Sequence, residues 1–174
     1  MNIETFLNIL RREALLNVRK CTDITNDDDD DTALANRIKI QKYVYLAKYF
    51  NIDLDFDYTT YNMYIHGPYS PNLAEEYYRL ADEGFFESKP DNYDNIINNN
   101  TNLKNFIEFM KEDNRNDADW LEVASTALAF AKNHTNKEKL VDHVAYVKYR
   151  FDKEYIKRVI EDLEKSSLLI LKSQ

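Results

Sequence analysis

Residues 61–84 read YNMYIHGPYSPNLAEEYYRLADEG, and this stretch holds both glycines and two of the three prolines of a 174-residue chain. A chain that concentrates its special backbone residues in one place needs a sharply defined bend there. Ser70 is a suitable helix N-cap because its hydroxyl can accept from a free amide of the first turn, and Pro71 suits the first helical position. We therefore expect a strand over residues 61–65, a turn, and a helix that begins at Pro71. Gly84 suits the left-handed position after the end of that helix.

The segments on both sides of this helix have the pattern of short strands. Tyr61, Met63 and Ile65 occupy alternate positions, which is typical of a half-buried strand. Gly67 ends the alternation, and the proline that follows it favours extended backbone at this glycine. The two phenylalanines at residues 85–86 indicate the next short strand.

Two interpretations of the bend remain open. In the first, it is a structural corner and nothing more. In the second, it is a recognition surface whose aromatic side chains act as interface anchors. The candidate partner-binding residues are Tyr64, His66, Gly67, Pro68 and Tyr69.

The composition is that of a helical protein without disulfides. Glycine and proline are scarce, which favours long helices, and an apolar fraction of 44% is enough for a core. The net charge of −8 argues against nucleic-acid binding by the whole surface. Cys21 alone cannot form an internal disulfide, and no zinc ligand set surrounds it. The sequence shows neither a signal-peptide pattern nor an apolar run of about 18 residues, so we expect a cytoplasmic protein with no membrane partner.

The N-terminal part predicts a helix followed by an acidic loop. Apolar residues at helical spacing, from Ile3 to Ala14, indicate an amphipathic helix over residues 3–19. Residues 20–31 lose this periodicity and end in five aspartates, Asp27 to Asp31. A calcium-binding EF-hand loop is excluded, because its glycine and glutamate positions hold other residues. We expect a mobile acidic loop whose end lies at the N-terminus of the next helix.

Two long helices are expected to form the core. The first spans residues 32–50, with a broad apolar face and with Arg37, Lys39, Lys42 and Lys48 on the solvent side. The second spans residues 118–133 and is apolar on nearly every side, which is typical of a central helix. We expect this second helix to pack against the first. Between them, residues 90–102 predict a loop and residues 103–112 a shorter helix.

The C-terminal part has the outline of a helix-turn-helix. Helices are expected over residues 137–148 and 152–165, with Asp152 as the cap of the second. Residues 168–171 form an apolar run of strand length, which would be a vestigial wing. The fold class is therefore mainly α with a small β element, a multi-helix domain with winged-helix or helix-turn-helix character. We expect a single domain over 1–174. It consists of an N-terminal helix (1–19), an acidic loop (20–31), a central helical core with the Gly-Pro corner (32–131) and a helix-turn-helix-like C-terminal part (132–174).

The sequence contains no recognisable catalytic, cofactor or metal motif. The three histidines are far apart and lie in no metal-binding pattern, and no nucleophile elbow or phosphate-cradling glycine loop is present. We therefore expect no enzyme activity, no cofactor and no metal. His66 is the histidine beside the special turn, and it has a structural or interface role or else a titrating one. An enzyme, such as a nuclease, would need a pocket that gathers His66 with carboxylates or basic groups.

A DNA-binding alternative depends on the C-terminal helix pair. From residue 132 onward the chain has ten Lys or Arg against seven Asp or Glu, whereas the remainder is strongly acidic. The candidate phosphate contacts are Lys153, Lys157 and Arg158. Acidic residues on the same helix would oppose this role.

Two motifs resemble those of a known family. The stretch RIKIQKYVYL at residues 37–46, followed by YIHGPYSPNL at residues 64–73 and by Gly84, resembles the uncharacterised YwgA-like proteins of bacteria and archaea. It is similar, more distantly, to the phage-associated proteins of the Panacea or SocA-like antitoxin class. The match covers about residues 33–86, with a looser echo at 118–131. His66 and the aspartate loop depart from the family pattern.

The resemblance implies a helical domain with winged-helix character and, from the antitoxin relatives, non-enzymatic neutralisation of a toxin. The leading hypothesis is therefore a non-enzymatic protein-binding module, antitoxin-like or a phage-associated regulator, with a toxin or regulatory target as partner. The alternative is a winged-helix transcriptional regulator that binds DNA. The sequence identifies neither the partner nor the oligomeric state.

Overall fold

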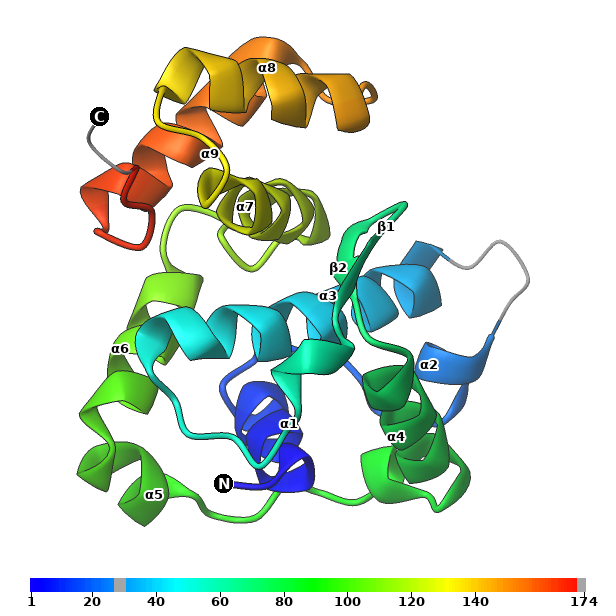
Figure 1. Cartoon of the computed structure of the whole chain (residues 1–174). Coiled ribbons are helices and arrows are strands. Elements are labelled where there is room, and N and C mark those ends of the chain that lie inside the picture. Colours follow the sequence, from blue (N-terminus) through cyan, green and yellow to red (C-terminus); the bar gives the residue numbers. More distant parts are fainter. Residues whose placement is uncertain (27–30, 172–174) are drawn as a thin grey trace.

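The computed structural model describes residues 1–26 and 31–171, and these residues form a mainly helical molecule with one small sheet (Figure 1). The two strands form an antiparallel hairpin. The elements are α1 Ile3–Arg12, α2 Thr22–Thr25, α3 Asp31–Ala47, β1 Asn62–Tyr64, β2 Gly67–Tyr69, α4 Pro71–Asp82, α5 Asp94–Asn99, α6 Thr101–Lys111, α7 Ala118–Ala131, α8 Lys137–Val147 and α9 Lys153–Lys165.

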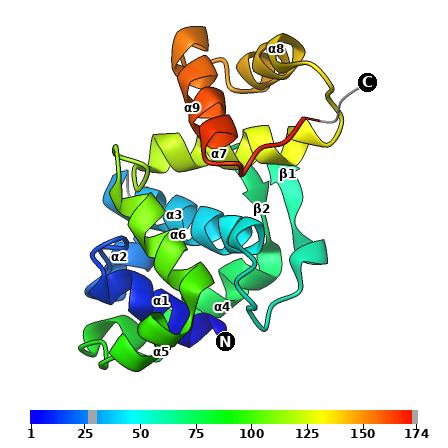
Figure 2. The same ribbon diagram turned by 90° about the vertical axis from the view of Figure 1, so that its left-hand side faces the viewer.

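Helix α7 is the centre of the molecule, as the sequence predicts. It lies between the α8–α9 pair and α3, an arrangement visible in both ribbon views (Figure 2). Its apolar residues are buried from Trp120 to Leu128. The alanines Ala124 and Ala127 are fully buried, and small side chains let neighbouring helices approach closely. Three polar residues are buried with them, Glu122, Ser125 and Thr126.

The N-terminal helix is shorter than predicted. α1 ends at Arg12, and the exposed Ala14 adopts a φ of 59°, which a continuing helix does not allow. The amides of Leu15 and Leu16 then bond back to the carbonyl of Leu10. The predicted helix to residue 19 is therefore wrong, because the chain reverses and buries these two leucines instead.

The expected acidic loop over residues 20–31 contains a short helix. The short helix α2 lies within residues 20–31, and Asp31 begins α3. Residues 27–30, which carry the other four aspartates of the predicted mobile loop, lie outside the described residues.

The segment after α4 differs from the prediction in two places. Gly84 takes the expected left-handed conformation with a φ of 75°, but residues 85–87 then form a 3-10 turn and not a strand. The Arg11 guanidinium donates hydrogen bonds to the carbonyls of Phe85, Phe86 and Ser88. A partner strand would need these same acceptors. The predicted loop at 90–102 contains α5 and the start of α6.

The C-terminal helix pair forms as predicted, but its wing does not. Asp152 caps α9 by accepting from the amides of Glu154 and Tyr155. Residues 168–171 form no strand; the amides of Leu168 and Leu169 bond to the carbonyl of Leu163 after a left-handed Ser167. The predicted strand is wrong because this run folds back on its own helix and buries Leu169.

Every helix in the described part of the chain is too short or too polar to cross a lipid bilayer.

Candidate functional site

The hairpin places its second strand in the core and its first strand outside. β1 pairs with β2 from Asn62↔Tyr69 to Tyr64↔Gly67, which leaves Ile65 and His66 as the connecting residues. β2 contacts both α3 and α7, so β1 is exposed along its whole length. The predicted half-buried alternation over residues 61–65 is therefore wrong, because β2 occupies the core-facing position.

Gly67 brings the hairpin against α7. It is the first residue of β2 and has a φ of +87°, a value that glycine adopts without a steric penalty. A Cβ added here would lie 2.6 Å from Thr126 Oγ1 and 3.5 Å from the carbonyl oxygen of Glu122. The absence of a side chain thus allows both the turn and the close contact.

The corner after β2 is clamped by α3 through backbone atoms. Ser70 caps α4 as predicted, and its Oγ accepts from the amide of Leu73. The Gln41 side chain donates to the Ser70 carbonyl and accepts from the Ser70 amide, both at 2.9 Å. Beside it, Lys42 Nζ donates to the carbonyl of Pro68 at 2.6 Å.

Lys42 is fully buried, so the prediction that it faces solvent is wrong. The hairpin covers the side of α3 that the sequence pattern assigns to water, and the Pro68 carbonyl supplies an acceptor there. Burial lowers the pKa of Lys42 to about 7, partly opposed by the negative charge of Glu122.

Glu122 is the centre of a buried charge network under the hairpin tip. Its Oε1 lies 2.9 Å from Lys148 Nζ, and its Oε2 lies 2.8 Å from His66 Nδ1 and 3.0 Å from Arg150 Nη2. Burial alone would raise the pKa of Glu122, but the hydrogen bonds from these three basic groups lower it to about 2. Lys148 Nζ also donates to the carbonyl of Ile65, so the network fixes the tip through its backbone.

The sequence-based interpretation missed Glu122, Lys148 and Arg150. One signal was present: Glu122 is the charged residue inside the apolar run 120–131, and a carboxylate in such a helix requires a buried partner. Nothing in the sequence identifies the partners, because they come from the α8–α9 turn and from the hairpin.

Two hollows flank the tip. One, of about 370 Å³, is lined by Met63, Tyr64 and Ile65 of the hairpin, by Tyr149 and by the members of the Glu122 network. The other, of about 200 Å³, is lined by a further set of tyrosines and by Lys42. Both hollows share Tyr64 and His66.

The structure brings the aromatic members of the predicted partner-binding set together. The rings of Tyr64 and Tyr69 lie 5.5 Å apart, and His66 is half-exposed beside them. Gly67 and Pro68 are buried and position the tip from below. The predicted set therefore divides into a surface part and a supporting part.

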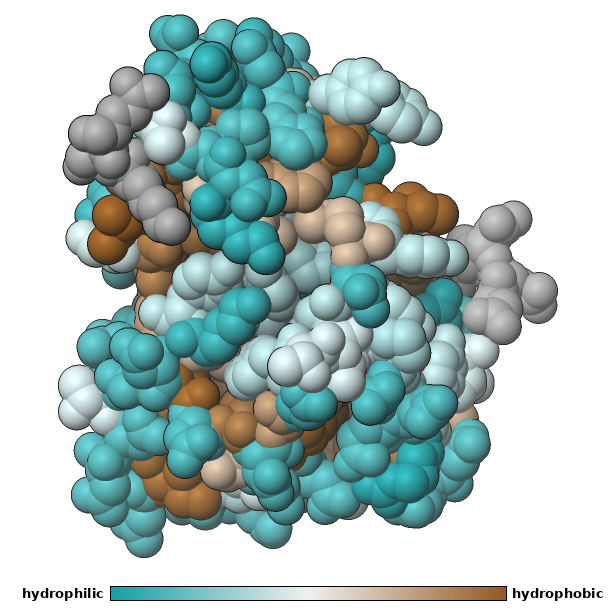
Figure 3. Space-filling model, in the orientation of Figure 1, coloured by the Kyte–Doolittle hydropathy of each residue, from teal (hydrophilic) through white to brown (hydrophobic). Residues whose placement is uncertain are grey.

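The exposed apolar side chains around the tip form what we term the hairpin-tip patch. Tyr64 and Ile65 are 63% and 71% exposed, and Tyr149, which lines the same hollow, is 88% exposed. In Figure 3, brown atoms stand at the end of the hairpin near the pale atoms at the end of α8. The patch consists of Met63, Tyr64, Ile65 and Tyr149, which are all exposed and all line this hollow.

The Glu122 network orients the imidazole of His66, but it leaves no carboxylate oxygen free and provides no metal site among the described residues. The ionised Glu122 accepts from His66 Nδ1, which leaves Nε2 for another partner. The hollow therefore gathers His66 with a carboxylate and basic groups, the condition that an enzyme would have to meet. Both oxygens of Glu122 are already bonded, and the described residues contain no cluster of three side chains that could hold a metal ion.

The candidate phosphate contacts lie on α9, away from the hairpin. Lys153 Nζ is 2.5 Å from Asp142 Oδ1 on α8, so its charge is compensated. Lys157 and Arg158 are exposed. The structure thus offers two of the three predicted groups to a phosphate backbone.

Comparisons of the chain with protein-family models, with curated proteins and with solved structures found no match. The site geometry alone therefore supports a function.

Proposed function

We propose that this chain is a non-enzymatic protein-binding module that contacts its partner through the hairpin-tip patch. The observation that carries the proposal is the exposure of this patch on a hairpin held by buried groups. The resemblance to antitoxins would make the partner a toxin or a regulatory target of a phage-associated system.

Exposed aromatic side chains of this kind are the usual anchors of protein interfaces. Tyrosine combines a large apolar ring with a hydroxyl that can stay hydrated, which makes it favourable at an interface and tolerable without one. Ile65 has no polar group, yet it stands at the tip. A contiguous apolar patch on a surface this acidic is typical of an interaction site.

The supporting contacts reduce the entropy that binding would cost. Gln41, Lys42 and Lys148 all bond to backbone atoms of the bend, at Ser70, Pro68 and Ile65. A loop fixed in this way loses less conformational freedom when it binds a partner.

The test captures the partner with variants of the tip. Tagged protein expressed in the source organism should recover a stoichiometric partner, and Tyr64→Ala with Ile65→Ser should abolish that recovery. The matched control is Ile96→Ser on α5, because Ile96 is also exposed, at 42%, but lies outside the patch. Equal recovery by both variants would contradict the proposed surface.

The non-enzymatic part of the proposal has a separate test. Purified protein should leave RNA, DNA and simple esters intact over hours. Hydrolysis that His66→Gln removes, with the fold retained by circular dichroism, would show that the Glu122–His66 pair acts as a base and would refute this part.

DNA binding through α8 and α9 remains a second proposal, favoured by the tight turn between the two helices and by the exposure of Lys157 and Arg158. Binding to operator DNA should weaken steeply with salt and fall further in Lys157→Ala with Arg158→Ala. No mobility shift at low salt on DNA from the native locus would end this alternative.

A further inference from the structure

A separate hollow of about 560 Å³ lies on the β1 side of the hairpin. Its walls come from the hairpin, the C-terminal ends of α3 and α7, and residues 168–170. Met63 is the residue that it shares with the hollow beside Tyr149. This volume falls within the range of small-molecule sites, about 300–1,000 Å³.

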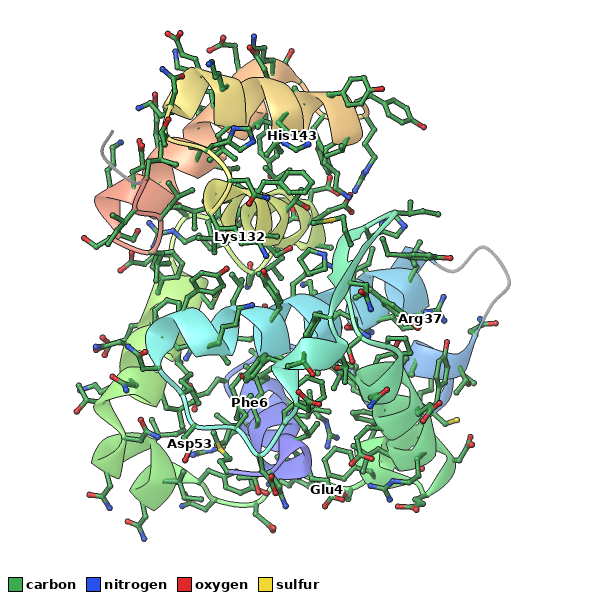
Figure 4. All side chains as sticks on the ribbon, in the orientation of Figure 1. Glu4, Phe6, Arg37, Asp53, Lys132 and His143 are labelled. Carbon is green, nitrogen blue, oxygen red and sulfur yellow. The ribbon has the colours of Figure 1, made fainter. Side chains whose placement is uncertain are left out.

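Two lysines of like charge face this hollow. Lys48 follows α3, and Lys132, labelled in Figure 4, follows the last residue of α7. Of the described residues that line the hollow, none is acidic. Burial and the charge of Lys132 together lower the pKa of Lys48 to about 8.

Aromatic rings surround the first of these lysines. Lys48 Nζ lies 3.6 Å from the centroid of the Tyr45 ring and 5.1 Å from that of Tyr49. Tyr61 and Phe130 also line the hollow. The rings hold the ammonium by cation–π attraction, and within residues 1–26 and 31–171 no carboxylate forms an ion pair with it.

We infer that this hollow binds a small organic anion with a planar apolar body. The acidic group would lie between Lys48 and Lys132, where it relieves their mutual repulsion and makes charge-assisted hydrogen bonds. The apolar body would pack on Tyr61 and Phe130. This inference is independent of the protein-binding proposal, because neither lysine belongs to the hairpin-tip patch.

The test uses two probes that differ in charge. One is 1-anilinonaphthalene-8-sulfonate, an anion with a planar aromatic body, and the other is the neutral N-phenyl-1-naphthylamine. Fluorescence titration at low salt should show one saturable site for the anion. Lys48→Met and Lys132→Met should each weaken the binding of the anion roughly tenfold, the order expected for losing a charged hydrogen bond. Both should leave the binding of the neutral probe within about twofold, because the apolar walls remain.

Two control variants locate the site. Lys104→Met removes an exposed lysine on α6, and Arg150→Gln removes a cation from the other side of the hairpin; neither should change the affinity for the anion. The near-ultraviolet circular dichroism of each variant confirms native packing around Trp120. The inference is overturned by a lack of saturable anion binding, by equal affinity in the wild type and both lysine variants, or by loss in Arg150→Gln alone.

Discussion

Replacing Gly67 by alanine should destabilise the protein by about 2–5 kcal/mol. A non-glycine residue at a φ of +87° costs about 1–2 kcal/mol, because its Cβ approaches the following carbonyl oxygen. The same Cβ would lie 2.6 Å from Thr126 Oγ1, and overpacking of this kind adds about 1–3 kcal/mol. Thr126 cannot turn away freely, because its hydroxyl donates to the carbonyl of Glu122 at 2.7 Å.

Urea unfolding at 25 °C measures this effect, and Gly84→Ala provides the matched comparison. Gly84 has a similar φ of +75°, but its added Cβ would meet only the far end of the Glu87 side chain. Gly84→Ala should therefore cost about 1–2 kcal/mol, the backbone part alone.

A double-mutant cycle separates the two parts at Gly67. Thr126→Ala removes the atom in conflict, so its combination with Gly67→Ala should be less destabilising than the sum of the single changes by about 1–3 kcal/mol. Thr126→Ser keeps the hydroxyl and should give no such relief. The reasoning fails if Gly67→Ala costs no more than Gly84→Ala, or if Thr126→Ala and Thr126→Ser relieve it equally.

Three further predictions concern buried charge and capping. Between pH 7 and about 10, Lys42 binds more protons in the unfolded chain than in the folded one. The free energy of unfolding of the wild type should therefore rise relative to that of Lys42→Met as pH increases, by up to about 1.4 kcal/mol per pH unit. Free energies of unfolding that change with pH in the same way for both proteins would refute this. Glu122→Gln should lower the free energy of unfolding by about 3–5 kcal/mol near neutral pH, and this difference should fade as pH falls from 4.5 towards 2. Glu164→Gln, at a partly exposed ion pair, should cost less than about 1 kcal/mol, and similar losses in the two variants would contradict the network. Asp152→Ala should lower the free energy of unfolding by about 0.5–2 kcal/mol through loss of the α9 cap, and an unchanged urea midpoint would argue against it.

Local chemistry made much of the fold predictable. Ser70 and Asp152 cap their helices where the sequence predicts, because a cap depends only on its neighbours within one turn. The apolar pattern of α7 predicts a central helix, since it leaves no face suited to water. Each of these predictions rests on contacts within a few residues of the chain.

The errors arise where a distant segment determines the outcome. Lys42 has the residue type of an exposed position, but the hairpin covers it and offers the Pro68 carbonyl. Residues 85–87 have the apolar pattern of a strand, but Arg11 takes their carbonyls from another part of the chain. Tertiary hydrogen bonds of this kind leave no periodic signal in the sequence.

The exposed side chains of the candidate site could be predicted from the sequence, but the buried charged residues that fix the tip could not. Tyr64, His66 and Tyr69 lie together because a hairpin brings them together, and a turn at Gly67 is a local property. The cations that bond to Glu122 come from the α8–α9 turn, and Lys148 is 83 residues from Ile65, the tip residue whose carbonyl it binds. Only the folded structure relates them.

The side chains that fix the bend bond to main-chain atoms, so the bend does not depend on which side chains the tip carries. Lys42, Lys148 and Gln41 would hold the same carbonyls and amide whatever side chains occupied positions 64 and 65. Substitutions at the tip can therefore change specificity without loosening the framework beneath it. Single substitutions at the tip could therefore adapt the binding specificity to a partner whose surface changes during evolution.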